Sequence, residues 1–170
     1  MVVQAVADMM AQRILAIIGC GNPNRSDDGV GPEVVARLCG RPLPDGVKLY
    51  DAGTDGMSVM YRARGASHLI IIDARAPEGA PGAIYNVPGD ILAAPPPSSL
   101  NLHDFRWDHA LYAGRRIYGS DFPGKVKVLL VEAQSLSLGL GLTPAVAQAA
   151  EKVCADIVDM AGAFACGRWA

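Results

Sequence analysis

The sequence predicts an α/β fold, a three-layer sandwich in which a twisted, mostly parallel central sheet of about five strands carries helices on both faces. Short apolar runs alternate along the chain with segments of helical periodicity, and most of the runs are continuous, as in strands buried on both faces. The composition agrees, because 51% hydrophobic and 19% charged residues are typical of a chain with a large core. We expect a single domain of 17.8 kDa over residues 1–170, with residues 1–12 as an N-terminal extension.

The first predicted strand covers residues 13–19 (RILAIIG), an apolar run that ends at glycine. Turn-forming residues follow it, and a helix is expected from Pro32, since proline is tolerated in a first turn. Either Asp27 or Asp28 is expected to cap this helix. Its apolar positions at helical spacing are Val34, Val35 and Leu38.

The remaining elements continue this alternation of strands and helices. Residues 83–87 (AIYNV) alternate between apolar and polar side chains, which is typical of an edge strand, and the turn before them allows an antiparallel direction. Residues 89–102 are rich in proline and serine, so we expect a surface loop over a site. Further strands are predicted over residues 47–51, 68–74 and 125–132, and further helices over residues 56–64, over residues 103–116 and from Thr143 onward.

The charge and the cysteine content exclude several classes of protein. A net charge of −2 and a pI near 5.9 argue against nucleic-acid binding, since no basic excess is available for phosphates. No apolar run reaches the roughly 18 residues of a membrane-spanning helix, and the start of the chain lacks the basic segment of a secretory signal. The cysteines show no CxxC spacing, so we expect reduced thiols in a cytoplasmic protein: Cys20, Cys39, Cys154 and Cys166.

Acidic residues follow several of the predicted strands. Because ligands of open parallel sheets bind at the carboxyl ends of the strands, these acids are expected to meet at one edge of the sheet. Two carboxylates about 4 Å apart repel by about 4 kcal/mol at an effective dielectric constant near 20, so the cluster needs a proton, a divalent metal, or an arginine such as Arg25 or Arg75. The acids are Asp27, Asp28, Asp51, Asp73 and Glu132.

Asp28 and Asp73 each have a structural and a functional interpretation. Asp28 is either the cap of the following helix or, if Asp27 serves as the cap, free to face a ligand. Asp73 either holds a loop amide or contacts a ligand, because an unpaired acid after an apolar run is costly to desolvate. The residues alone leave both alternatives open.

Of the histidines, His103 has the best position for chemistry. It lies where the proline-rich loop enters a predicted helix, near solvent, which suits a metal ligand or a proton carrier. His68 begins a strand and His109 lies on the apolar side of a helix, so both are expected to be structural. An imidazole with two carboxylates forms an open metal site that leaves positions for substrate or water.

Other catalytic motifs are incomplete or missing from the sequence. The segment GCGNPN is similar to the dinucleotide fingerprint, but Asn24 stands where the third glycine belongs. There is no GxxxxGK[ST] phosphate loop, no HExxH zinc motif and no GxSxG nucleophile elbow. These observations disfavour a nucleotide-binding enzyme and a serine hydrolase.

Residues 19–31 (GCGNPNRSDDGVG) resemble the GxGNxxxxD[DE]GxG signature of the hydrogenase maturation proteases. These are the endopeptidases that trim the C-terminus of [NiFe]-hydrogenase large-subunit precursors. Four further segments are similar to the family pattern and occur in the same order: residues 51–54 (DAGT), 72–74 (IDA), 103–104 (HD) and 135–146 (SLSLGLGLTPAV). The resemblance extends over residues 14–158, nearly the whole chain.

This resemblance implies an α/β sandwich and a nickel-dependent endopeptidase that processes the large-subunit precursor. The family's metal site carries over to Asp28, Asp73 and His103, which are then both the metal ligands and the catalytic residues. Nickel is expected to arrive in the precursor's cysteine-rich active site, although the same ligands also accept other divalent metals. The expected partner is the precursor, with no nucleic acid or membrane involved, and we expect a monomer.

The chain departs from the family pattern in two places that concern acids. Asp28 stands where some relatives have glutamate, which gives a shorter reach. Glu132 is followed by Ala133, where proline is more usual, and we therefore leave Glu132 outside the site. Asp51 either positions substrate or closes the turn before Gly53.

Three alternatives use the same residues differently. Asp28 and Asp73 sharing a proton would activate water without a catalytic metal. A chaperone would hold the nickel-loaded precursor through the same ligands without cutting it. A dinucleotide-binding oxidoreductase would use the glycine loop, which lacks its third glycine.

Overall fold

The structure, a computed structural model, describes residues 13–89 and 106–169 of the chain. Five strands form its central sheet: β1 (Leu15–Cys20), β2 (Val47–Gly53), β3 (His68–Arg75), β4 (Ile84–Pro88) and β5 (Lys125–Glu132). They are hydrogen-bonded side by side in the order β2-β1-β3-β5-β4. The first three strands and β5 run parallel, whereas β4 pairs antiparallel with β5 at the edge. The alternating segment is therefore an antiparallel edge strand.

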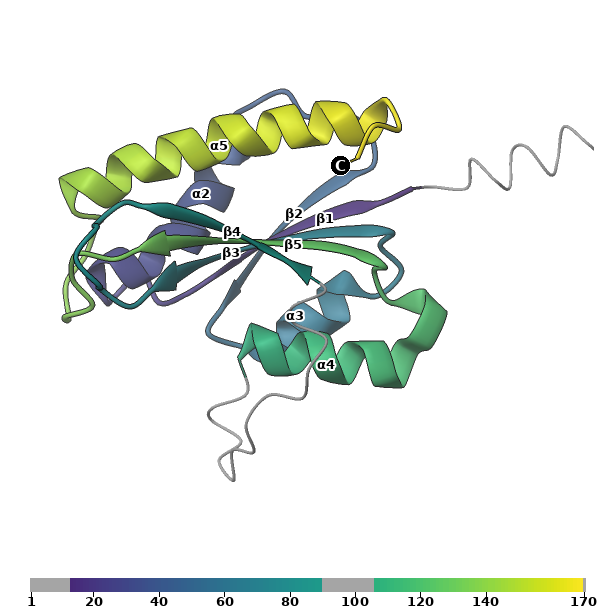
Figure 1. The fold of residues 1–170 in the computed structure, drawn as a ribbon, viewed down its shortest axis with the longest axis horizontal. Helices are drawn as coiled ribbons and strands as arrows, with labels where there is room; N and C mark the ends of the chain where they lie inside the picture. Colours follow the sequence, from purple (N-terminus) through teal and green to yellow (C-terminus); the bar gives the residue numbers. More distant parts are fainter. Residues whose placement is uncertain (1–12, 90–105, 170) are drawn as a thin grey trace, which may run out of the picture.

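Helices cover both faces of this sheet, which confirms the predicted three-layer α/β sandwich. On one face lie α2 (Val30–Leu38) and α5 (Pro144–Ala165), and on the other lie α3 (Gly56–Ala63) and α4 (Trp107–Tyr118) (Figure 1). Two 3-10 turns, η1 (Ser26–Gly29) and η4 (Gly119–Asp121), precede α2 and follow α4. Within the described ranges, no helix has the length and apolarity to cross a membrane.

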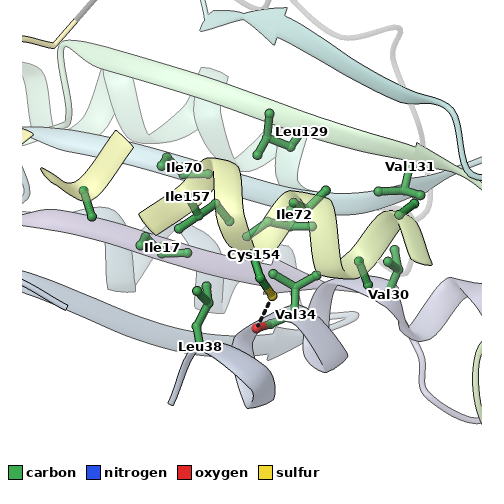
Figure 2. Packing of buried hydrophobic residues seen from close by; sticks show 14 of the residues in the cluster. Ile17, Val30, Val34, Leu38, Ile70, Ile72, Leu129, Val131, Cys154 and Ile157 are labelled. Atoms are coloured by element: carbon green, nitrogen blue, oxygen red, sulfur yellow. Dashed lines mark hydrogen bonds between the residues drawn. The ribbon is translucent and has the colours of Figure 1, made fainter. Parts of the chain in front are cut away.

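Successive side chains of a central strand pack into the helical layers on opposite faces of the sheet. Because both layers are buried, the strand sequence is continuously apolar. Ile70 packs toward α2 and α5, while its neighbour Ile71 packs toward α3 and α4, and both are fully buried. Figure 2 shows Ile70 beneath α5, close to Ile157. In the same layer the Cys154 thiol of α5 donates to the carbonyl oxygen of Val34 in α2, at 3.7 Å. The two helices of this face therefore pack on each other as well as on the sheet.

The helices differ slightly from their predicted bounds. α2 begins at Val30, ahead of Pro32, because the first N–H groups of a helix have no partner inside it and the missing donor of proline is harmless there. α4 begins at Trp107 and continues to Tyr118. Its predicted start at His103 lies outside the described residues.

Glycine allows α2 to begin directly against the sheet. A Cβ atom on Gly31 would lie 2.2 Å from the carbonyl oxygen of Cys20 and 2.6 Å from that of Ile72. Any side chain at this position would push α2 away from β1 and β3. The connection from β1 through η1 to α2 is thereby held at the carboxyl ends of the strands.

Candidate functional site

A pocket of about 200 Å³ opens at the carboxyl ends of β1, β2 and β3, the edge at which the acids were predicted to meet. Its walls come from the ends of these strands, the start of α3 and the residues that begin α4. Asp28 and Asp73 both line it, together with Cys20, Arg106 and Trp107. The structure therefore brings two of the three predicted site residues to one cavity.

Asp73 lines this pocket and is almost completely buried. Its Oδ1 accepts the N–H of Ala74 at 2.8 Å, while its Oδ2 accepts Trp107 Nε1–H at 2.7 Å and a guanidinium N–H of Arg106 at 3.1 Å. Burial raises the pKa of Asp73 above its usual value, and the charge of Arg106 and the donated hydrogen bonds oppose this shift. Asp73 is thus oriented on both oxygens and paired with one cation.

Asp28 belongs to η1 and lines the same pocket as Asp73. Its Oδ2 accepts the N–H of Asn22 at 2.9 Å, which fixes the carboxylate within its own loop. Gly21 makes this loop geometry accessible, because its φ of +128° favours glycine and a Cβ there would lie 1.8 Å from the Asp28 carbonyl oxygen. The side chain remains half-buried, at the wall of the cavity.

Asp27 has a different role from its neighbour. The prediction that Asp27 or Asp28 caps α2 is wrong: the cap residue is Gly29, and no side chain accepts a hydrogen bond there, because both acids lie in η1, the 3-10 turn that precedes the helix. The fully buried Asp27 carboxylate accepts instead from three N–H groups and one hydroxyl of the segment after β5, at 2.7–3.0 Å. The donors are the N–H groups of Gln134, Ser135 and Thr143 and the Thr143 hydroxyl.

Two further acids belong to turns outside the pocket. Asp51 Oδ1 accepts the N–H of Gly53 at 2.8 Å, so of its two predicted roles the turn-closing one has a direct contact. Glu132 is buried and accepts from the N–H groups of Glu78 and Ala80 and from the Tyr85 hydroxyl. These bonds, that of Ala80 first, lower the pKa of Glu132. Glu132 therefore anchors the loop between β3 and β4.

The cation that pairs with Asp73 was not predicted from the sequence. Arg75, one of the two expected partners, forms an ion pair with Glu78. Arg106 contacts Asp73 instead, and Trp107 beside it donates the second hydrogen bond. The signal that could have found them is their place near the start of the helix predicted over residues 103–116, a few residues after the loop expected to cover a site.

The structure describes two of the three histidines. His103 lies outside the described residues, so its place in the site stays a prediction; within residues 13–89 and 106–169, no three His, Cys, Asp or Glu side chains are arranged to hold a metal ion. His68 starts β3, at the end away from the pocket, and packs edge-on against Phe164 and Trp169. Burial, reinforced by nearby cations, lowers the pKa of His68 to about 4. His109 is half-buried, with Nδ1 3.0 Å from an Asp108 oxygen.

Cys20 adds a thiol to the pocket wall at the end of β1. Burial, together with the adjacent negative charge of Asp73, raises the pKa of the Cys20 thiol far above its usual value. The group is therefore a neutral thiol and a poor nucleophile at physiological pH.

The chemistry of this pocket suits a cation or an oriented water molecule. Asp28 and Asp73 supply carboxylate oxygens, which are suitable donors for divalent metals. Arg106 already contacts the Asp73 carboxylate, so the donor set fits a cation but is partly neutralised. A third ligand must come from outside the described cluster or from the substrate.

Comparisons of the sequence place it among known proteins. The sequence profile of the hydrogenase maturation proteases matches residues 32–160. The hydrogenase 2 maturation protease of Escherichia coli strain K12 is 33% identical over 136 residues, which cover 79% of this chain and 81% of the relative. The coenzyme F420 hydrogenase subunit delta of Methanothermobacter thermautotrophicus is 27% identical over 159 residues, which cover 87% and 94%.

Solved structures with the same architecture also include hydrogenase maturation proteases. The hydrogenase maturating endopeptidase HybD from E. coli superposes with a TM-score of 0.73 at 27% identity and covers 91% of this chain and 94% of its own. The [NiFe] hydrogenase maturation protease HycI from Thermococcus kodakarensis KOD1 has a TM-score of 0.67 at 18% identity and covers 91% and 97%. The second likeness concerns the fold alone.

Proposed function

Because this chain belongs to the hydrogenase maturation protease family, we propose that it is the endopeptidase that removes the C-terminal extension of a nickel-loaded [NiFe]-hydrogenase large-subunit precursor. The observation that supports this most directly is the convergence of Asp28 and Asp73 on one pocket at the carboxyl edge of the sheet. The four cysteines are free thiols, which is in keeping with a cytoplasmic reaction.

His103 completes the proposed set of ligands and catalytic residues. Three steps of 3.8 Å between consecutive Cα atoms limit the distance from Arg106 to His103 to about 11 Å. Arg106, whose side chain reaches Asp73, follows His103 at this short separation along the chain, which supports the assignment. An imidazole is a suitable third ligand beside two carboxylates.

Nickel belongs to the substrate in this proposal and arrives with the precursor's own thiolates. Bound between Asp28, Asp73 and His103, it would dock the precursor and polarise the scissile carbonyl. Trp107 and the Ala74 amide keep the Asp73 carboxylate in one orientation, and the Asn22 amide does the same for Asp28. Selectivity would come from the thiolates that accompany the nickel, since two carboxylates and an imidazole do not by themselves select it.

The test is the intact mass of a large-subunit precursor after incubation with this protein, with and without nickel loading. Loss of a C-terminal peptide from the loaded precursor alone is the expected result. Asp28→Asn and Asp73→Asn should abolish it, while Asp156→Asn, an exposed acid on α5, should not. Stable binding without a change in mass would identify a chaperone instead, and failure to bind or cut either form would overturn the proposal.

A further inference from the structure

The ion pair between Asp73 and Arg106 is strongly asymmetric. The Arg106 side chain is 63% exposed, whereas the Asp73 side chain is 6% exposed. The guanidinium therefore loses little when it turns away into solvent, but the carboxylate would be left buried and without a countercharge. Among the described residues, Arg106 is the cation in contact with this carboxylate.

Arg106 can leave Asp73 without disturbing the elements around it. It lies just before α4, in extended backbone with φ −89° and ψ −179°, and its side chain makes no capping hydrogen bond to the helix. Trp107, the first residue of α4, is buried and keeps its own hydrogen bond to Asp73 Oδ2. The carboxylate would thus stay in position while the guanidinium moves.

An incoming ligand meets this ion pair on Asp73 and the Asp28 carboxylate in the same pocket. A divalent cation that binds both carboxylates competes with the guanidinium for Asp73 and replaces its charge. A peptide segment brings only neutral amide donors, which cannot compensate the buried carboxylate in the same way. A cation can therefore take the place of Arg106 on Asp73, whereas an uncharged chain cannot replace its charge.

We propose that Arg106 is a specificity-determining residue that acts as a placeholder cation: it occupies Asp73 in the free enzyme and gives way to the nickel of a loaded precursor, so that a nickel-free precursor leaves the pair closed. This inference rests on the proposed function and assigns to one side chain the discrimination between loaded and empty substrate. Binding breaks the Arg106–Asp73 hydrogen bond and forms a nickel–carboxylate contact. No electron or proton needs to be transferred.

The first test measures binding of Ni²⁺ alone to the full chain by calorimetry. Arg106→Gln should bind at least about tenfold more tightly than the wild type, because the competing charge is gone. Arg106→Lys, which keeps a cation, should stay near the wild type. Arg116→Gln removes the same charge from the exposed far end of α4 and should change nothing. Equal affinities of the wild type and Arg106→Gln, or no binding by either, would overturn the proposal.

A second measurement keeps Arg106 in place. In a Trp169→Phe variant, Trp107 is the single remaining tryptophan, and its indole touches the same Asp73 oxygen as Arg106. Titration with Zn²⁺, which does not quench fluorescence, should shift the Trp107 emission as the guanidinium departs. Zn²⁺ binding without a change in emission would contradict the displacement.

Processing assays separate this inference from the function on which it rests. The KM for nickel-loaded precursor should fall at least about tenfold in Arg106→Gln, as the Ni²⁺ dissociation constant does, because no guanidinium has to leave Asp73. If the wild type cuts neither precursor, the proposed function fails regardless of Arg106. If the wild type cuts only the loaded precursor and Arg106→Gln keeps both the wild-type KM and the wild-type Ni²⁺ affinity, the placeholder role fails and the function stands.

Discussion

Replacing Asp27 by asparagine should destabilise the protein and leave its cleavage activity intact. Replacing Asp28 by asparagine should abolish cleavage and leave the stability nearly unchanged. Asp27 is fully buried and receives its hydrogen bonds from the segment after β5. Asp28 is half-buried at the pocket wall and accepts from Asn22. The two adjacent aspartates therefore differ in burial, in hydrogen-bond partners and in access to the pocket.

The magnitude follows from the bonds that the amide cannot make. With the asparagine oxygen in the Oδ2 position, its NH₂ group faces the Thr143 N–H, which leaves that buried donor unsatisfied at a cost of about 1–3 kcal/mol. The bonds from Gln134, Ser135 and the Thr143 hydroxyl lose their charge assistance, which removes roughly 0.5 kcal/mol each. We expect a loss of about 3 kcal/mol, which lowers Tm by roughly 6–12 °C for a chain of this size. For Asp28→Asn we expect less than about 1 kcal/mol.

Urea unfolding followed by circular dichroism gives both free energies, and precursor cleavage at 25 °C gives both activities. Asp27→Asn should unfold at lower urea with an unchanged m value and still cut, while Asp28→Asn should unfold near the wild type and not cut. An Asp27→Asn variant as stable as the wild type would refute the energetic reasoning. Loss of cleavage in a stable Asp27→Asn variant, with Asp28→Asn active, would reverse the two assignments.

Three further predictions concern stability, pH and the choice of histidine. Gly31→Ala should lower the free energy of unfolding by about 3 kcal/mol or more, because its Cβ would overlap backbone atoms of β1 and β3; a variant with wild-type urea stability would show that α2 can shift at little cost. His68 is neutral in the folded state with a pKa of about 4, so as pH falls below 6.5 the unfolded state gains the proton first and stability declines until about pH 4. Between pH 7 and pH 4.5 this should remove about 2 kcal/mol, measured as the difference between the wild type and His68→Phe, and parallel pH profiles of the two would contradict it. His103→Ala should abolish precursor cleavage and His109→Ala should leave it nearly intact; the opposite result in the mass assay would mean that the wrong histidine was chosen.

The sequence predicted the strands and the edge at which Asp28 and Asp73 meet, because continuous apolar runs identify parallel strands and parallel strands bring their carboxyl ends together. It did not predict the role of Asp27, since the partners of Asp27 lie more than a hundred residues further along the chain. Arg106 was missed for a related reason. Its contact with Asp73 depends on where a long connection returns to the sheet, and periodicity carries no information about that return.

The hydrogen bonds that hold η1 also determine when this turn can reach its final position during synthesis. The backbone of residues 24–26 pairs with Gly139, and Asp27 is held by donors that begin at Gln134. During synthesis, the loop that carries Asp28 leaves the ribosome long before these donors exist, and such distant contacts are among the slowest to form. The loop that carries Asp28 is therefore anchored to the rest of the protein only after β5 and the segment beyond it have been made. Proteolytic competence is one of the last properties that the growing chain acquires.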